Sequence, residues 1–457
     1  MRTRFPHWLL ALAVAGGCAL YSDVSVSPLI YDPANIDRGG DVQSMLRKAD
    51  FNRAIEFASA IDEKPRHSAQ ELAALGEIEM IAGRYDDARR HLRAAIDLEP
   101  FRTVYAGIAW DLSQLEYMCN NYESSLDWAK VARDKGINVR PWHIDYLQAL
   151  SNVNVYRFTS ETRQRVPMRA SRPDVPRIEV GLNGNHHVSA IVDSGAVLSI
   201  MSQSLASSLS VKLLGPFEGT FAGLLNEPIN VKFGILDTLD IGHMQIANVP
   251  VAIMPDDKMK FLVSGKKEFK IDFLLGANLL KEFRIDLDFR RDLVTFERIP
   301  PGGHHPAPDQ NLFIQQFRPA IRGTVNRHGW YMFIFDTGSE VTFLNERLLG
   351  NLPIQQFGPG IHNATLQGLG GSQKHGEKVE NVEIGIDKWA GTFRTLPMYD
   401  AGEHEHATGI IGENFLRNFN VVIDFGRMRV DLTPIGAAAL ANRMEEPLPA
   451  DQGKVPR

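Results

Sequence analysis

The chain of 457 residues has few cysteines, little net charge and only one clear apolar run near its start. Its two cysteines leave no pair for an intramolecular disulfide if one of them is modified. The net charge is −6, and Lys and Arg are scattered rather than gathered into a stripe, which excludes a nucleic-acid-binding protein. The apolar run, Trp8 to Ala15, is too short to span a bilayer. The length predicts two or three domains.

The first residues have the pattern of an export signal. Arg2 and Arg4 form a basic region, the apolar run follows, and small residues lead to Cys18. This arrangement resembles the lipobox of bacterial lipoproteins. The resemblance implies a signal peptide over residues 1–17, cleavage before Cys18, a lipid on its thiol that anchors the chain to a membrane, and a tether over 18–40.

By the same resemblance, Ala19 directs the chain to the outer membrane of the cell envelope, where it faces the periplasm. Ala15 stands where such signals more often have Leu, and a secretory signal with an incidental cysteine is the alternative. If Cys18 carries lipid, Cys119 is the only thiol left. Its place in an apolar helical stretch indicates packing in a core.

Residues 41–150 contain a repeat. Phe51, Tyr85 and Tyr122 stand at matching places, with spacings of 85 − 51 = 34 and 122 − 85 = 37, and a small residue follows three positions after each. This period and pattern resemble tetratricopeptide (TPR) repeats, which implies helix pairs stacked into a curved slab that binds a protein partner. A helical spacer without a partner is the alternative.

The composition changes after the repeats. Short runs rich in Val, Ile and Phe, broken by Gly, Asn and Pro, predict an all-β region from about residue 173. A Pro- and Gly-rich stretch, "PPGGHHPAPDQ", divides this region into two segments of similar length. The expected organisation is a linker over 151–172, a first lobe over 173–299, a linker over 300–310, a second lobe over 311–435 and a tail over 436–457.

The two β segments carry the same motif. "VSAIVDSGAVLSIM" matches "MFIFDTGSEVTFL", and "FLLGANLLKEFRIDLDF" matches "GIIGENFLRNFNVVIDF". The interval from the acid to the downstream glycine is 276 − 193 = 83 in one copy and 412 − 336 = 76 in the other. An ionised acid at the end of an apolar strand needs a partner or a task, because burying it alone costs several kcal/mol.

The duplicated motif resembles the retropepsin-like aspartic proteases of the pepsin clan. The resemblance implies an all-β bilobal fold, two fused copies of a retropepsin-like module, behind the all-α TPR-like region. It also implies aspartic endopeptidase activity on extended polypeptides. Two like charges a few Å apart cannot both ionise, so the pair would share one proton and activate a water. The implied site consists of catalytic Asp193 and Asp336, hydroxyls of Ser194 and Thr337 that hydrogen-bond across the pseudo-twofold axis, and Gly195 and Gly338, which admit close approach.

Each copy should also carry a flap hairpin. In the second copy, Gly368, Gly370 and Gly371 stand at the expected tip, and in the first copy residues 219–242 are the counterpart. Neither hairpin has the Tyr expected of a pepsin flap. Val197 also departs from the family pattern, and Glu340 adds a third acid near the pair.

No metal or cofactor is expected. The pairs His186/His187 and His304/His305, and the run Glu403 to His406, lack ligand spacing across a core and read as solvated loops. The sequence thus predicts a lipid-anchored envelope peptidase of the aspartic type. A non-catalytic binding protein that keeps the fold as a scaffold is the runner-up, and a structural anchor with a decayed protease is the third possibility.

Overall fold

The structure, a computed structural model, is described here for part of the chain. The described residues are 13–15, 24–28, 54, 67–98, 104–159, 161–169, 175–184, 186–222, 228–263, 267–347, 364–368, 373–400 and 407–435.

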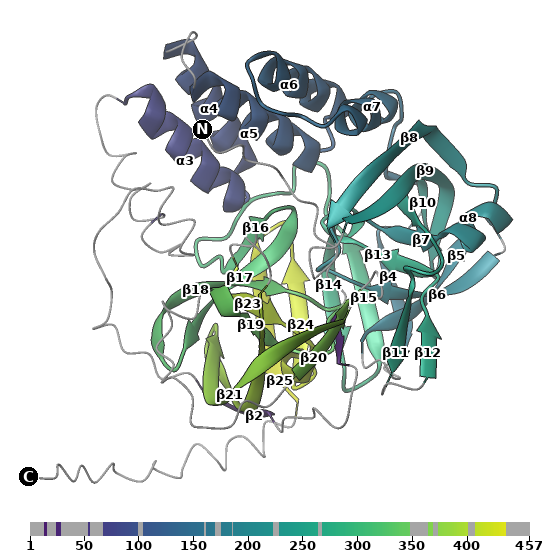
Figure 1. Cartoon of the computed structure of the whole chain (residues 1–457), viewed down its shortest axis with the longest axis vertical. Coiled ribbons are helices and arrows are strands. Elements are labelled where there is room, and N and C mark those ends of the chain that lie inside the picture. The colour runs from purple at the N-terminus through teal and green to yellow at the C-terminus, as the bar shows by residue number, and fades with distance from the viewer. Residues whose placement is uncertain are drawn as a thin grey trace, which may run out of the picture.

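Helices dominate the N-terminal part and lie together above the strands in Figure 1. Ser68 and Glu71 open the first of them with a capping box: the Ser68 hydroxyl accepts a hydrogen bond from the Glu71 N–H (3.2 Å), and the Glu71 carboxylate accepts one from the Ser68 N–H (2.9 Å). Within the described ranges, no helix is long and apolar enough to cross a membrane. The helices are α3 (Ala69–Ile81), α4 (Tyr85–Leu98), α5 (Val104–Met118), α6 (Tyr122–Asp134) and α7 (Pro141–Leu150).

These helices pack as neighbouring antiparallel elements with a shared apolar interior. Gly76 on α3 lies so close to Leu92 on α4 that a Cβ would overlap the Leu92 side chain. Cys119, at the end of α5, is partly buried against the same interior, and its sulfur accepts a hydrogen bond from Arg89 (3.4 Å). Burial raises the pKa of the Cys119 thiol to about 11, which suits a packed rather than a reactive thiol.

A β-rich region follows the helices and divides into two lobes, the first on the right of Figure 1 and the second on the lower left. The first lobe contains β3 (Arg157–Phe158), β4 (Arg163–Arg169), β5 (Arg177–Leu182), β6 (His186–Val192), β7 (Ile200–Ser202), α8 (Gln203–Ser208), β8 (Lys212–Ala222), β9 (Pro228–Ile241), β10 (Met244–Met254), β11 (Lys260–Val263), β12 (Lys267–Lys270), β13 (Phe273–Leu275), α9 (Ala277–Leu280), β14 (Phe283–Asp288) and β15 (Leu293–Arg298).

The second lobe repeats this element order with fewer insertions. It contains β16 (Leu312–Gln315), β17 (Arg318–Val325), β18 (His328–Phe335), β19 (Phe343–Asn345), β20 (Ala364–Gly368), β21 (Gln373–Ile386), β22 (Trp389–Tyr399), β23 (Gly409–Ile411), α10 (Glu413–Leu416), β24 (Phe419–Asp424) and β25 (Arg429–Pro434).

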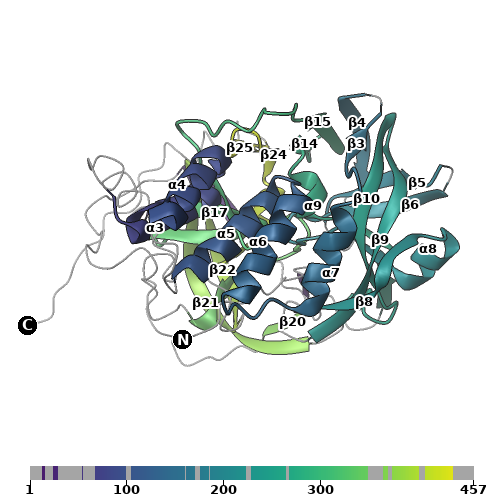
Figure 2. The same cartoon turned by 90° about the horizontal axis from the view of Figure 1, so that it is seen from above.

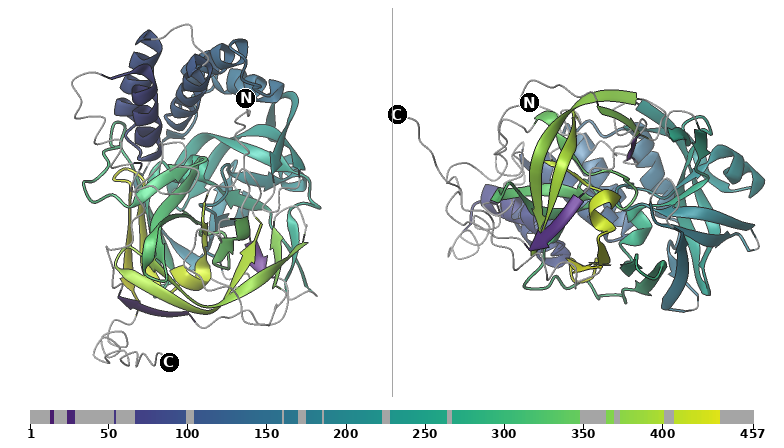
Figure 3. Two further views of the ribbon diagram at one scale, coloured as in Figure 1. Left: turned by 60° about the vertical axis from the view of Figure 1, so that its left-hand side comes forward. Right: turned by 90° about the horizontal axis from the view of Figure 1, so that it is seen from below.

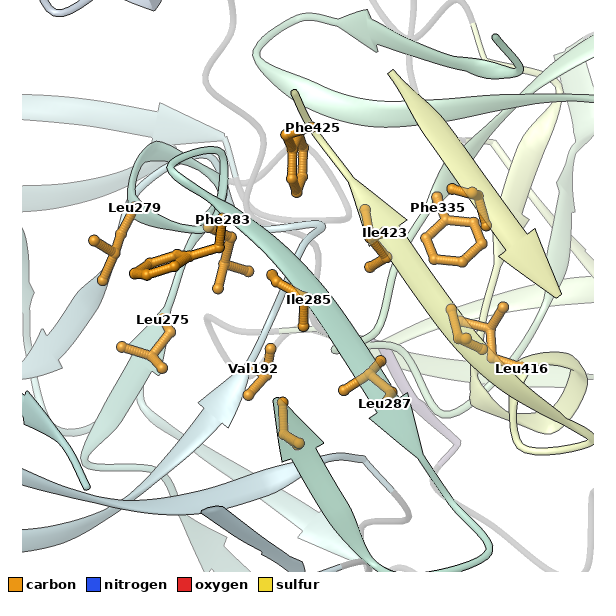
Figure 4. Packing of buried hydrophobic residues seen from close by; sticks show 14 of the residues in the cluster. Val192, Leu275, Leu279, Phe283, Ile285, Leu287, Phe335, Leu416, Ile423 and Phe425 are labelled. Atoms are coloured by element: carbon orange, nitrogen blue, oxygen red, sulfur yellow. The ribbon is translucent and has the colours of Figure 1, made fainter. Parts of the chain in front are cut away.

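One sheet runs through both lobes. Its strand order is β25-β24-β14-β15-β4-β5-β6-β13-β7-β10-β9-β8, and the lobes meet where β14 pairs antiparallel with β24. Figure 4 shows the core at this junction: Ile285 and Leu287 on β14 lie beside Ile423 on β24, with Val192 and Phe335 to either side. Val192 and Phe335 each precede one of the two motif acids, so this core fixes the strand ends from which those acids project.

Three segments differ from the expectations from sequence. Residues 151–172, expected as a linker, include β3 and β4, and β4 joins the sheet between β15 and β5. In β4 buried Val166 and Met168 alternate with exposed Arg165, Pro167 and Arg169, a period-2 pattern that the surrounding arginines obscure. The expected tether contains β2 (Val24–Pro28), which pairs with β22, and the expected signal peptide contains β1 (Ala13–Ala15), which pairs with β20.

The helical region is not a separate arm but shares a core with the first lobe. Trp142 and Tyr146 on α7 pack on Phe233 of β9, with ring centroids 5.7 Å and 4.5 Å apart, and Trp142 also contacts Phe221 of β8. Gly219 makes room for this contact, because a Cβ there would press on both Phe233 and Trp142. Viewed from above, α7 lies beside β8 (Figure 2). The helices and the β8–β9 hairpin are therefore held in one unit.

Candidate active site

Asp193 and Asp336 occupy the same place in the two lobes. Each follows the last residue of a strand, β6 or β18, that pairs in parallel with a short strand, β13 or β23. The backbone N–H of Asp193 donates to Leu275 O, and that of Asp336 donates to Ile411 O, both over 3.0 Å. Both side chains are fully buried. These backbone hydrogen bonds thus fix the position of the Cα atom from which each carboxyl side chain extends.

A glycine behind each acid allows two chain segments to cross. A Cβ on Gly276 would overlap the backbone of Leu198, and a Cβ on Gly412 would overlap that of Val341. Beyond the glycines, Ala277 N–H donates to Ala196 O (2.7 Å), and Glu413 N–H donates to Ser339 O (2.8 Å). These crossings close a buried loop behind each acid, and each is made at the downstream glycine that the two copies of the motif share.

The two acids face each other across the lobes. A Cβ built on Gly195 would overlap the carboxyl group of Asp336, and a Cβ on Gly338 would overlap that of Asp193. Each glycine of one lobe therefore contacts the acid of the other, and only a residue without a side chain fits there. The structure brings together the two acids and the two glycines that the sequence motif singled out.

Hydrogen bonds between the lobes hold the two acid loops together. Ser194 Oγ donates to Phe335 O (2.6 Å), and Thr337 Oγ1 donates to Val192 O (2.6 Å). In return, Thr337 N–H donates to Ser194 Oγ and Ser194 N–H donates to Thr337 Oγ1, both over 3.1 Å. All four groups are buried, so the exchange satisfies polar atoms that would otherwise be left without partners.

One further hydroxyl group supports each loop, and neither was predicted as a site residue from the sequence. Ser199 Oγ accepts from Gly276 N–H (3.1 Å) and donates to Asn278 Oδ1 (3.1 Å). In the second lobe, Thr342 Oγ1 accepts from Gly412 N–H (3.0 Å). Ser199 and Thr342 each stand six residues after their acid (199 − 193 = 342 − 336 = 6), and this equal spacing is the signal that could have found them.

The carboxyl groups have strongly perturbed acidity. Burial raises the pKa of Asp193 well above its ordinary value, and the charge of Asp336 raises it further. Burial also raises the pKa of Asp336, to about 7, against the lowering effects of the Gly338 N–H and of the Arg318 charge. Each Oδ1 accepts a backbone hydrogen bond, from Ala196 N–H (2.9 Å) or Gly338 N–H (2.8 Å). Near neutral pH the pair thus holds a proton.

The second oxygen of each carboxyl receives no backbone hydrogen bond in the part of the chain that the structure describes. Oδ2 of Asp193 and Oδ2 of Asp336 are buried and accept no hydrogen bond from any other group of the described residues. When one carboxyl is protonated, a hydrogen bond between the two raises the pKa of Asp193 and lowers that of Asp336. The arrangement can therefore hold one proton and one negative charge side by side.

The remaining candidate residues lie around this center or outside the described residues. Gly368 ends β20, whereas Gly370, Gly371 and Cys18 fall outside them. Glu340 is partly exposed, and its carbonyl accepts from Asn414 N–H (3.2 Å). The hairpins β8–β9 and β20–β21 stand where flaps were expected, and Figure 3 shows the second hairpin crossing below the strands of its lobe.

No metal site is found in the described part of the chain, where no three His, Cys, Asp or Glu side chains come together. His186 and His187 are exposed at the start of β6. His304 instead lies against Tyr85 of α4, with ring centroids 6.2 Å apart, and burial lowers its pKa. The run from Glu403 to His406 lies outside the described residues.

Comparison with known proteins agrees with this geometry in the first lobe. Residues 178–279 match the family described as aspartyl protease, a segment that spans Asp193 and Gly276. No curated protein matches the chain.

Solved structures with similarity to this chain include a retropepsin-like aspartic protease from Rickettsia conorii, with 18% identity, 31% of this chain and 96% of that chain covered, and a TM-score of 0.20. An aspartic proteinase from Irpex lacteus has 11% identity, with 60% of this chain and 98% of that chain covered, and a TM-score of 0.34. Conglutin gamma, a basic 7S globulin from lupine seeds, has 12% identity, with 62% of this chain and 97% of that chain covered, and a TM-score of 0.37.

Replacing Thr337 by Val should weaken the junction of the lobes. The variant keeps the volume but leaves Val192 O and Ser194 N–H without their partner, and each unsatisfied buried group costs about 1–3 kcal/mol. Urea unfolding should report this loss, while Thr337→Ser, which keeps the hydroxyl, should stay within about 1 kcal/mol of the wild type. Equal stability of Thr337→Val and Thr337→Ser would contradict the role of the crossed hydrogen bonds.

Replacing Asp193 by Asn should stabilise the protein at high pH. Because the folded-state pKa is raised, the folded protein keeps a proton that the unfolded chain releases above about pH 4, so stability falls as pH rises. Asn cannot ionise and escapes this loss. We expect the melting temperatures to agree at pH 4 and the variant to lead by several degrees at pH 8, corresponding to roughly 1 kcal/mol or more.

The control for this comparison is Asp127→Asn, which removes an exposed acid on α6. It should follow the wild type at both pH values. A lead of Asp193→Asn that is the same at pH 4 and pH 8 would show that ionisation of Asp193 is not its cause.

Proposed function

We propose that this protein is an aspartic endopeptidase that hydrolyses peptide bonds of extended polypeptides with a water activated between Asp193 and Asp336. The observation that carries the proposal is the reciprocal contact of each acid with the glycine of the other lobe. Two buried carboxyls forced together share a proton, and few structural roles need such a pair. The match of residues 178–279 to aspartyl proteases supports the same chemistry.

The reaction needs only the pair, the water and the peptide. The ionised carboxyl takes a proton from the water, whose oxygen attacks the peptide carbonyl carbon, while the protonated carboxyl gives its proton to the carbonyl oxygen. When the tetrahedral diol collapses, the C–N bond breaks and the leaving nitrogen takes a proton from the carboxyl that had accepted one from the water. One hydroxyl of the diol gives its proton to the other carboxyl and becomes the carbonyl oxygen of the product acid. One carboxyl ends with the proton and the other with the charge, so the cycle closes without a covalent enzyme intermediate.

The flap hairpins would hold the substrate. An extended peptide can add backbone hydrogen bonds to a strand edge while its alternate side chains enter pockets on either side. The two candidates differ in their support. The β8–β9 hairpin is packed on α7 through Phe221 and Phe233, whereas β20 of the β20–β21 hairpin pairs with β1. We propose that the substrate lies between these hairpins.

Replacing either Asp193 or Asp336 by Asn should reduce cleavage of an unfolded polypeptide mixture by at least about 10²–10⁴-fold, because one half of the acid–base pair is lost. Mass spectrometry of the products from pH 3 to pH 8 measures this. Asp127→Asn, which removes an exposed acid on α6 away from both hairpins, is the matched control and should cleave as the wild type does. Full activity of either active-site variant would refute the proposal, and peptide binding without cleavage by the wild type would favour the scaffold alternative.

We also propose that the protein is held at the cell envelope by a lipid on Cys18, facing the periplasm. The support is the order of basic, apolar and small residues that ends at this cysteine. In bacterial cells, Cys18→Ser should move the protein from the membrane fraction to the soluble fraction, whereas Cys119→Ser should stay with the membranes. Retention of Cys18→Ser in the membrane fraction, with its full precursor mass, would be explained by an uncleaved signal instead.

A further inference from the structure

The two acids have different neighbours across the sheet. In the second lobe, Ala320 pairs with Ile334, and continuing this antiparallel register by two residues places Arg318 opposite Asp336. In the first lobe, Arg177 pairs with Ile191, and the same step places Val175 opposite Asp193. Side chains directly opposite each other in an antiparallel pair lie on the same face of the sheet. An arginine in one lobe thus replaces a valine in the other.

Both of these neighbours are inside the protein. Arg318 and Val175 are each 1% exposed, and Arg318 is among the largest fully buried side chains. A guanidinium stays charged at any pH the protein meets, so this position holds a permanent buried positive charge. Its Nη2 donates a hydrogen bond to Gln316 Oε1 (3.1 Å), which helps to orient the group.

The charge of Arg318 reaches one acid of the pair. It lowers the pKa of Asp336, whereas the charge that acts on Asp193 is that of Asp336, which raises its pKa. Besides Asp193, the titratable groups on the elements around Asp336 include Glu340 on its own loop, Glu413 on α10, Arg322 on β17 and His328 on β18. Among the main influences on the acidity of Asp336, Arg318 is the cation, and Val175 at the matching place beside Asp193 carries no charge.

We propose that Arg318 is a positioning residue that places the shared proton on Asp193 and leaves Asp336 as the negatively charged partner. This inference rests on the proposed function for its catalytic meaning, but the proton position itself does not depend on cleavage. In the reaction, Asp336 then takes the proton from the water and Asp193 donates its proton to the peptide carbonyl oxygen. The roles that a symmetric pair would exchange freely are thereby assigned.

The cation should also move the pH range of the enzyme. It stabilises each ionised form of the pair, and an opposite charge within a few Å lowers the pKa of a carboxyl by about 1–3 units. Removing it should therefore shift both limbs of the profile of kcat/KM against pH to higher values. Loss of Arg318 would make the pair harder to ionise at acid pH and keep it singly protonated at higher pH.

The first experiment observes the proton directly. The protein is labelled with ¹³C at the aspartate carboxyl carbons, and the two signals are assigned with Asp193→Asn and Asp336→Asn. In the wild type, the Asp193 carboxyl should titrate at higher pH than that of Asp336. In Val175→Arg/Arg318→Val, which moves the cation to the other lobe, the order should reverse. Equal titration of the two carboxyls in the wild type, or an unchanged order in the exchanged variant, would overturn the proposal.

The second experiment uses activity. Arg318→Met should shift the acid limb of kcat/KM upward by about 1 pH unit or more, while Val175→Met, the matched substitution beside the other acid, should leave it in place. Arg318→Lys keeps the charge and should restore the limb toward the wild-type position, which a purely packing role would not do. If Arg318→Met does not fold, the wild-type titration and Arg318→Lys still decide the matter.

The two proposals can fail separately. A wild type that cleaves no peptide but shows the expected order of carboxyl titration would refute the peptidase and leave the proton position standing. An active peptidase whose acid limb is the same in Arg318→Met and in Val175→Met would refute the role of Arg318 alone.

Discussion

The site depends on the crossed contact between the two acid loops. Ser194 and Thr337 each bond to the backbone of the opposite loop, and Gly195 and Gly338 let the opposite carboxyl approach. Each lobe therefore completes the surroundings of the other lobe's acid. Neither half holds a paired carboxyl by itself, and the acidity of both groups follows from their being pressed together away from water.

Larger elements hold this contact in place from two directions. The pairing of β14 with β24 ties the lobes into one sheet, and the apolar core around Ile285 and Ile423 lies directly behind the strands that end at the acids. On the outer side, α7 packs its aromatic residues on the β8–β9 hairpin. The helical region is thus part of the framework around the first lobe. The tetratricopeptide character of these helices stays a prediction, although Tyr85 and Tyr122 each begin a helix.

Sequence reasoning found the part of the site that repeats in the chain. An acid after an apolar strand, a glycine two residues later and a second glycine far downstream recur in both halves, and physical chemistry requires each of them. The features that depend on the register between strands were not predicted from the sequence. The charged strand β4 was taken for a linker because its alternation is carried by only Val166 and Met168. Arg318 drew no attention because nothing in the sequence places it opposite Asp336 until β17 and β18 are paired.

The covalent union of the two lobes has a consequence for how such a center can diverge. In an assembly of two identical subunits, every substitution occurs on both sides of the axis, and the two acids keep equivalent surroundings. In this chain the positions held by Val175 and Arg318 belong to separate stretches of coding sequence. A mutation can therefore alter one side and spare the other, so that one half specialises as acid and its twin as base.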